Sequence, residues 1–153
     1  MKFKVFRFKK VKSTNNTAIR VLKNTNIYYG MISSETQNNG RGHYGKKWIS
    51  YKGNLFVSFF FKLDNLRISF KQLTKMNCLL VKKILSTYYK KKIIYKKPND
   101  LLIDKKKIWG ILQETLTKLD KKYLIVGVGL NLITPSLHKQ VPRILDPTIF
   151  DKN

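Results

Sequence analysis

Two short turns in the second half of the sequence constrain the fold more than any other feature. The segments DKKK (104–107) and LDKK (119–122) separate three runs that are rich in apolar and β-branched residues. The runs cover residues 92–103, 107–118 and 123–133. Turns this tight join strands that lie next to each other and run in opposite directions. The sequence therefore predicts an antiparallel meander for this part of the chain.

The first half of the chain predicts further strands and one short helix. Strand composition marks three segments, at 3–8, 27–36 and 54–63, and the last of these reads as a buried strand. Between the first two, residues 13–23 predict a helix that begins at Ser13 or Thr14, since either side chain can cap a helix N-terminus.

The longest periodic segment, residues 69–89, predicts a second helix. Apolar residues recur in it at spacings of three and four: Leu73, Met76, Leu80, Ile84 and Tyr88. This spacing places them on one helical face. Ser69 and Gln72 match the spacing of a capping box at its start. Strands and segregated helices in this order predict an α+β domain rather than one of alternating parallel strands and helices.

Composition narrows the class of protein. The chain has 153 residues, which suits one domain, and it carries 32 Lys and Arg against 8 Asp and Glu, for a net charge of +24. Such a charge attracts nucleic acid, phosphates and acidic proteins, although a general bias toward Lys, Asn and Ile would explain it as well. Cys78 is the single cysteine, so no disulfide can form within the chain. No signal peptide or membrane span is recognisable, and we expect a cytoplasmic protein.

The segment QNNGRGHYGKKW (37–48) has the composition of an anion-binding loop. Its glycines allow backbone N–H groups to approach a ligand closely, and Arg41 can grip a carboxylate or a phosphate with two hydrogen bonds. Trp48 offers a flat face for a heterocyclic ring. A basic surface turn without a ligand is an equally good interpretation of this segment alone, and the P-loop pattern is absent.

Three later segments also hold candidate functional residues: KKPNDLL (96–102), KKIWGILQET (106–115) and VGVGLNL (126–132). Asp100 could hold Mg²⁺ or belong to an ordinary turn. Lys107, at the start of a strand, could neutralise an anionic substrate or be solvated. Gly127 and Gly129 suggest close approach by a ligand or another backbone, or else a bulge, and Asn131 needs partners in its apolar surroundings.

Taken together and in this order, these motifs resemble the catalytic domain of biotin–protein ligases. The matching segments are STN (13–15), ETQNNGRGHYGKKW (35–48), KKPNDL (96–101), KIWGILQE (107–114) and VGVGLNL (126–132). The resemblance implies a mixed or antiparallel sheet with flanking helices, in the class II aminoacyl-tRNA synthetase-like fold that biotin and lipoate ligases share. It implies a catalytic domain at 1–133, followed by a short tail at 134–153 and no second domain.

The resemblance also implies an activity. Members of this family activate biotin with ATP and Mg²⁺ to biotinyl-5'-AMP, then transfer the biotinyl group to a lysine of a biotin carboxyl carrier protein. The implied biotin site comprises Ser13, Thr14, Asn15, Gln37, Gly40, Arg41, Gly42, His43, Lys107 and Gly110. The implied ATP site comprises Arg41, His43, Lys46, Trp48, Asn99, Asp100 and Asn131. Lys107 and Arg41 are the implied catalytic residues, and Asp100 the implied Mg²⁺ ligand.

The sequence departs from the family pattern in three places. His43 stands where a second arginine is common, so we expect weaker retention of biotinyl-AMP. Lys97 stands where the family usually has tryptophan. About 20 residues follow GLNL, so the C-terminal SH3-like barrel of family members is expected to be missing. No helix-turn-helix segment precedes the domain, and we expect no repressor role and no specific nucleic-acid partner.

Two other functions compete with this interpretation. A lipoate–protein ligase or octanoyltransferase would use the same fold, but the thiol that a transferase needs is missing if Cys78 packs in the core. A non-enzymatic, basic nucleic-acid-binding protein would account for the net charge. In an enzyme, the same charge could steer an acidic carrier domain toward the site. No histidine cluster predicts zinc, His138 is expected to be solvated, and a homodimer is possible.

Overall fold

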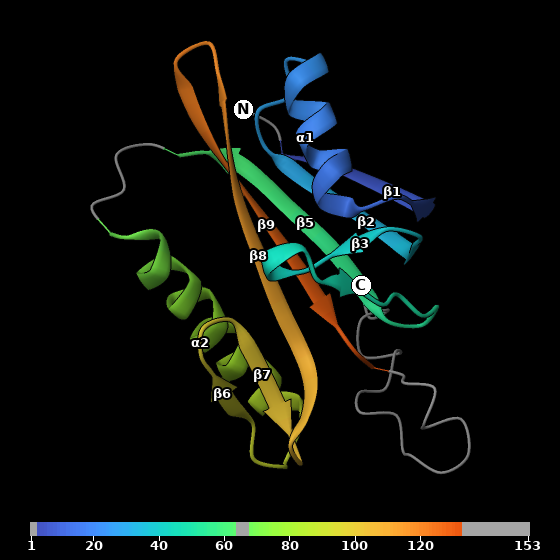
Figure 1. Ribbon diagram of the computed structural model, residues 1–153, viewed down its shortest axis with the longest axis vertical. Helices are drawn as coiled ribbons and strands as arrows, with labels where there is room; N and C mark the ends of the chain where they lie inside the picture. Colours follow the sequence, from blue (N-terminus) through green and yellow to red (C-terminus); the bar gives the residue numbers. More distant parts are fainter. Residues whose placement is uncertain (1–2, 64–67, 133–153) are drawn as a thin grey trace.

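A seven-stranded mixed sheet forms the body of the protein in the computed structural model, which describes residues 3–63 and 68–132 (Figure 1). In spatial order its strands are β1 (Lys4–Val11), β2 (Gly30–Gln37), β5 (Leu55–Lys62), β9 (Lys121–Leu130), β8 (Lys106–Lys118), β7 (Asp100–Ile103) and β6 (Ile94–Lys96). β1 and β2 pair in parallel, and every other neighbouring pair is antiparallel. β3 (Gly40–Arg41) and β4 (Lys47–Trp48) form a separate two-stranded sheet, with a 3-10 turn at His43–Gly45 between them.

The predicted antiparallel meander is confirmed. β7, β8 and β9 follow one another through the two tight turns that the sequence marks. At the first turn Asp104 and Lys105 have φ of 48° and 61°, and at the second Leu119 and Asp120 have φ of 47° and 56°. Two consecutive residues with positive φ are the mark of the type I′ turn, whose twist suits an antiparallel hairpin. The turn residues therefore fix the pairing of the strands that carry most of the candidate site.

The two helices cover opposite faces of the sheet. α1 (Thr14–Asn24) packs Ala18 and Leu22 against a cluster that includes Tyr123 and Ile125 of β9. α2 (Phe70–Tyr88) packs against a second cluster that includes the alternate residues of β9, Leu124 and Val126. Successive side chains of a strand point to opposite faces, so the two helices lie on either side of the sheet. We call these the α1 face and the α2 face.

Both predicted helix starts are confirmed. The Ser13 side chain caps α1 by accepting a hydrogen bond from the backbone N–H of Asn16. The Ser69 hydroxyl accepts from the Gln72 backbone N–H, and the Gln72 side chain accepts from the Ser69 backbone N–H. These reciprocal bonds form a capping box, which satisfies donors that the first turn of a helix otherwise leaves unpaired.

The residues of the apolar stripe predicted for α2 do lie on one face of the helix. Most of that face, however, does not pack on the sheet. Four of its five members are exposed: Met76 at 56%, Leu80 at 58%, Ile84 at 49% and Tyr88 at 49%. The helix instead buries Thr74, Cys78 and Leu85. Apolar side chains occur around most of α2, so two stripes with the same periodicity compete, and periodicity alone does not determine which one meets the core.

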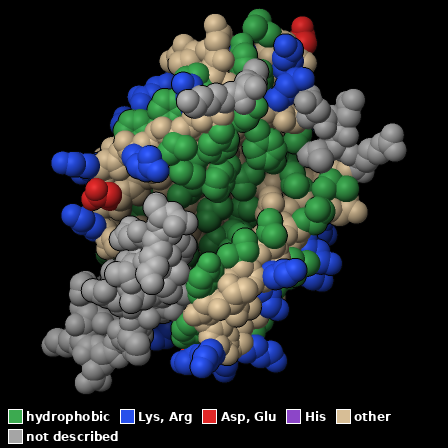
Figure 2. Space-filling view, turned by 180° about the vertical axis from the view of Figure 1, so that it is seen from behind, with side chains coloured by type: hydrophobic (Ala, Val, Ile, Leu, Met, Phe, Trp, Pro, Cys, Tyr) green, Lys and Arg blue, Asp and Glu red, His purple; other side chains and the backbone are tan. Residues whose placement is uncertain are grey.

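The strand predicted to be buried at 54–63 is well buried on the α1 face but only partly on the α2 face, where Val57 is buried. In β5 the side chains of Phe56, Ser58 and Phe60 lie on the α1 face and are buried, whereas Phe59 and Phe61 lie on the α2 face and are 38% and 39% exposed. Figure 2 shows hydrophobic side chains gathered over a hollowed face of the molecule.

Among the described residues, no helix is long and apolar enough to span a bilayer. The predicted tail at 134–153, with His138, lies outside the described residues.

Candidate active site

A cleft of about 340 Å³ lies on the α1 face of the sheet, at the N-terminus of α1. It brings together parts of the chain that are far apart in sequence: the start of α1, the end of β2, the β3–β4 hairpin, the turn before β7 and the first residues of β8. The predicted site residues that line it are Ser13, Thr14, Asn15, Gln37, Arg41, Gly42, His43, Lys46, Trp48, Asn99, Asp100, Lys107 and Gly110. The glycine-bearing segment and Lys107 therefore converge on one cleft.

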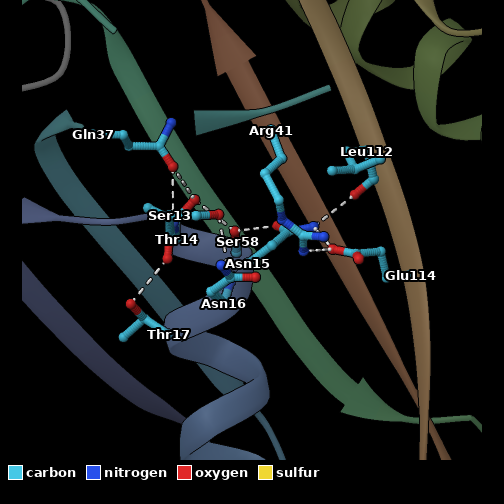
Figure 3. A network of polar contacts seen from close by, with 10 residues as sticks. All are labelled: Ser13, Thr14, Asn15, Asn16, Thr17, Gln37, Arg41, Ser58, Leu112 and Glu114. Carbon is cyan, nitrogen blue, oxygen red and sulfur yellow. Dashed lines mark hydrogen bonds and ion pairs between the residues drawn. The ribbon is translucent and has the colours of Figure 1, made fainter. Parts of the chain in front are cut away.

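A chain of hydrogen bonds forms the polar end of the cleft (Figure 3). The backbone N–H of Thr14 donates to Gln37 Oε1 over 2.8 Å, which ties the first residue of α1 to the end of β2. Gln37 Nε2 donates to Ser50 Oγ over 3.1 Å, just beyond the β3–β4 hairpin. Gln37 thus connects the helix to the glycine-bearing segment, and two sides of the cleft are held in a fixed relation.

Asn15 can lie against the sheet because the residue opposite it is Gly127. A β-carbon at this position would overlap the Asn15 side chain. The Asn15 amide donates from Nδ2 to the Leu112 carbonyl oxygen over 3.2 Å and to Glu114 Oε2 over 2.7 Å. β9 keeps a regular register at Gly127, so the bulge considered from the sequence is not present there. Close approach is confirmed, but the approaching group is a side chain rather than a backbone.

Trp48 lies over a second gap in the sheet, made by Gly110 and Gly129. A β-carbon at Gly110 would come within 2.7 Å of Trp48 Cζ3, and one at Gly129 would overlap the indole ring. Lys107 Nζ lies 4.9 Å from the Trp48 ring centroid, a cation–π distance, and 2.7 Å from Asp100 Oδ1 as an ion pair. The glycines on β8 and β9 thus make room for the indole, and the indole lies beside the candidate catalytic lysine.

Arg41 is anchored at one end and has unused donors at the other. Its Nη2 lies 2.5 Å from Glu114 Oε2 in an ion pair, with side-chain exposures of 36% for Arg41 and 24% for Glu114. Its Nε is buried and has no hydrogen-bond partner among the described residues. A buried N–H without an acceptor is costly, so this donor favours a bound acceptor in the cleft.

His43 joins the glycine-bearing segment to β8. Its Nε2 lies 3.0 Å from the Ile111 carbonyl oxygen, and Asn99 Nδ2 donates to the same oxygen over 3.0 Å. A carbonyl oxygen only accepts, so His43 carries a proton on Nε2. Two predicted nucleotide-side residues therefore meet at one backbone atom of the central sheet.

Two predicted site residues are not among those that line the cleft. Gly40 pairs with Trp48 in the β3–β4 hairpin, where a β-carbon would come within 2.5 Å of the Trp48 carbonyl oxygen. Asn131 donates from Nδ2 to the Lys107 carbonyl oxygen over 3.2 Å. Both residues support side chains that do line the cleft, and their predicted contacts with biotin and ATP stay predictions.

The structure also adds residues to which the sequence assigned no role. Ser58 and Glu114 bind the predicted site residues from below without lining the cleft. Ser58 is a polar residue within an apolar strand, and Glu114 ends the matching segment KIWGILQE, and these were the available signals. Tyr44, Lys47, Lys96 and Lys97 line the cleft with the predicted residues. With Arg41, Lys46 and Lys107 they give it a strongly cationic lining.

Cys78 lies in the core under α2, as predicted. It is fully buried, and burial, with a smaller contribution from the Asp100 carboxylate, raises the pKa of its thiol to about 12. At neutral pH the side chain is therefore a protonated thiol and a poor nucleophile. Within residues 3–63 and 68–132, no group of three or more His, Cys, Asp or Glu side chains is arranged to hold a metal ion.

Comparisons with known proteins match most of this chain. The model of the biotin/lipoate A/B protein ligase family matches residues 6–131. The bifunctional ligase/repressor BirA of Escherichia coli strain K12 is 30% identical over 110 residues, which cover 71% of this chain and 34% of that protein. The chain thus spans about a third of the length of this curated relative.

Solved structures show the same fold. The biotin protein ligase of Aquifex aeolicus, in complex with biotin and ATP, superposes with a TM-score of 0.72 at 30% identity and covers 95% of this chain and 57% of that one. The biotin acetyl coenzyme A carboxylase synthetase of Helicobacter pylori, with bound biotinylated ATP, gives a TM-score of 0.74 at 22% identity, with 88% and 63% covered. The predicted mixed sheet with flanking helices is confirmed for the part of the chain that the structure describes.

Proposed function

The chain belongs to the biotin/lipoate A/B protein ligase family, and on that premise we propose that it is a biotin–protein ligase. It activates biotin with ATP to biotinyl-5'-AMP and transfers the biotinyl group to a lysine of a biotin carboxyl carrier protein, as a biotin–acetyl-CoA-carboxylase ligase does. The curated relative is named a ligase, and the Aquifex aeolicus structure contains biotin and ATP. Because ATP is a substrate, we propose a cytoplasmic location.

One observation carries the proposal: Arg41 and Lys107 line the same cleft. In the first reaction a carboxylate oxygen of biotin attacks the α-phosphorus of ATP. The bond from that phosphorus to pyrophosphate breaks, and pyrophosphate leaves with the electron pair. Two anions must approach each other for this to happen, so fixed cations are the main requirement of the site. Arg41 has an unused buried donor, and Lys107 supplies a point charge that Asp100 holds in place.

The second reaction releases AMP. The amine of the carrier lysine attacks the acyl carbon, the bond from that carbon to the AMP oxygen breaks, and the amine gives up a proton. We assign the polar end of biotin to the residues at the start of α1 with Gln37, and the nucleotide base to the side of Trp48, Asn99 and Asp100. The open, lysine-lined side of the cleft would then receive the carrier.

Magnesium fits this donor set in a limited way. Asp100 is the acidic side chain that lines the described cleft, and a carboxylate oxygen is a suitable Mg²⁺ ligand. Magnesium commonly takes one or two carboxylates from the protein and fills its other positions with phosphate oxygens and water. Asp100 would hold the ion, whose charge would offset that of the phosphates. Lys107 forms an ion pair with the Asp100 carboxylate, so Lys107 and a bound Mg²⁺ would share that carboxylate.

Biotin-dependent exchange of pyrophosphate into ATP tests the proposal. We expect the wild type to catalyse exchange, and Lys107→Ala to reduce kcat by about 100-fold or more, because a charge that acts on the reacting phosphate is lost. Lys106→Ala is the matched control, since Lys106 is exposed and does not line the cleft. Exchange that depends on lipoate instead of biotin, or equal rates for Lys107→Ala and the wild type, would contradict the proposal.

A further inference from the structure

Glu114 lies beneath the polar end of the cleft and binds two of the residues that line it. Its Oε2 accepts from Arg41 Nη2 over 2.5 Å and from Asn15 Nδ2 over 2.7 Å (Figure 3). Glu114 belongs to β8, Asn15 to α1 and Arg41 to β3, so one oxygen atom connects three elements. Glu114 itself does not line the cleft.

The Glu114 carboxylate and the Leu112 carbonyl oxygen together set the direction of the hydrogen bonds around Asn15. An ionised carboxylate only accepts, so the Nδ2 end of the Asn15 amide must face Glu114. The Oδ1 end then faces Ser58, whose hydroxyl donates to it over 2.5 Å. The Ser58 hydroxyl also lies 2.8 Å from the Thr14 hydroxyl, which in turn lies 3.2 Å from Gln37 Oε1. Glu114 thus helps to fix the orientation of the polar groups at the start of α1.

The same carboxylate fixes the Arg41 guanidinium. A charge-assisted hydrogen bond between guanidinium and carboxylate is about twice as strong as a neutral one, and it holds the planar group in one orientation. Among the described residues, Glu114 is the side chain that binds Arg41, and it contacts only the Nη2 atom of the guanidinium. The buried Nε is left without an acceptor. Glu114 therefore anchors Arg41 without using all of its donors.

We propose that Glu114 is the positioning residue of the cleft, acting on biotin through Arg41 and Asn15. Its carboxylate holds the arginine that meets the biotin carboxylate and orients the amide beneath the other end of the site. The affinity for biotin then depends on a residue that biotin does not touch. The activity and affinity consequences rest on the proposed function, whereas the positioning of Arg41 does not.

The variant Glu114→Gln tests this, because it keeps the size of the side chain and removes its charge. The control is Glu35→Gln, which removes a carboxylate from an exposed ion pair with Lys52 at 3.6 Å. Calorimetric titration with biotin measures both Kd and the number of sites. We expect Glu114→Gln to raise Kd about tenfold at an unchanged number of sites, and to raise KM for biotin much more than KM for ATP. Glu35→Gln should match the wild type.

Two outcomes overturn the inference. One is an unchanged Kd for biotin in Glu114→Gln. The other is a reduced number of sites with an unchanged Kd, since that pattern means that part of the protein is unfolded and that Glu114 is merely structural.

A second measurement tests whether Glu114 positions Arg41 even if the wild type does not bind biotin. The Nε–H of Arg41 should give a protected signal in a ¹⁵N-correlated spectrum, assigned by its loss in Arg41→Lys. We expect this signal in the wild type and in Glu35→Gln, and its loss or fast exchange in Glu114→Gln. The same signal in Glu114→Gln as in the wild type would show that Glu114 does not position Arg41, whatever the substrate is.

Discussion

At the scale of single residues, the glycines of β8 and β9 act through the side chains that approach them. Asn15 lies against Gly127, and Trp48 lies against Gly110 and Gly129. The sheet therefore has two hollows on the α1 face, one at the polar end of the cleft and one under the indole. A methyl group is enough to close either hollow, so these glycines, which also line the cleft, help to shape it.

Gly127→Ala should destabilise the protein and weaken biotin binding together. The new β-carbon overlaps Asn15, and overpacking of this kind costs about 1–3 kcal/mol. Asn15→Ala in the same background should recover part of the lost stability, because it removes the overlapping atoms. Urea unfolding of the two single variants and the double variant measures the coupling. Additive effects within about 0.3 kcal/mol would mean that Asn15 is not the neighbour that matters.

Cys78 should make the stability fall at high pH. Its folded pKa is raised to about 12, above the ordinary thiol value of about 8.5, so the folded state keeps the proton after the unfolded state has lost it. Its contribution is fully present below pH 8.5 and is lost progressively as pH rises toward 12. The difference in unfolding free energy between the wild type and Cys78→Ala should shrink from pH 7 to pH 10. A difference that stays constant or grows would contradict a buried thiol.

The site residues that could be predicted from the sequence are those that lie within short local motifs. Arg41 and Lys107 were found because each lies in a local pattern with a glycine or a tryptophan nearby. Glu114 and Ser58 were not, because their roles come from contacts with Asn15, 99 and 43 positions away in sequence. A single polar residue in an apolar strand, such as Ser58, indicates that a partner is needed but does not identify it.

At the scale of elements, the turns and helix caps were predictable and the helix face was not. Turns and caps depend on residues within three or four positions, which the sequence presents directly. The face of α2 that packs on the sheet depends on the shape of the sheet, and α2 offers two apolar stripes. The parallel pairing of β1 with β2 likewise depends on α1 returning the chain between them. It was not predicted, since the resemblance implied only that the sheet is mixed.

Two substitutions in α2 distinguish its faces. Leu85 is buried in the core under the α2 face, whereas Leu80 is 58% exposed. Leu85→Ala should lower the unfolding free energy by about 2–5 kcal/mol, because it leaves a cavity, and Leu80→Ala should change it by less than about 0.5 kcal/mol. Chemical denaturation of both variants compares the same chemical change on two sides of one helix. Equal losses would mean that the exposed stripe is covered in solution.

At the scale of the whole molecule, the charge of +24 is a property of the surface rather than of the fold. Part of this positive charge lies at the cleft, which is lined by Lys46, Lys47, Lys96 and Lys97. A positive field there would attract ATP and also an acidic carrier domain. The competing function, binding of nucleic acid without catalysis, would use the same charge but would require neither biotin nor a shaped cleft.

Raising the salt concentration should slow transfer to the carrier more than it slows adenylation of biotin, if charge steers the carrier toward the cleft. Raising NaCl from 0.1 M to 1 M shortens the Debye length from about 10 Å to about 3 Å, which screens long-range attraction more than contacts inside the cleft. The kcat/KM for transfer to an acidic carrier domain should therefore fall several-fold more than the rate of biotin-dependent exchange. Parallel declines of the two rates would show that the carrier is not steered by charge.

Calorimetric titration of the protein with biotin, with lipoate as the comparison, tests most directly whether this cleft is a biotin site. We expect saturable binding of biotin at about one site per chain, with heat that is largely lost in Arg41→Ala and retained in Lys106→Ala, and little or no heat with lipoate. A folded wild type that gives no heat with biotin, or that binds it equally well without Arg41, would contradict the assignment of this cleft as a biotin site.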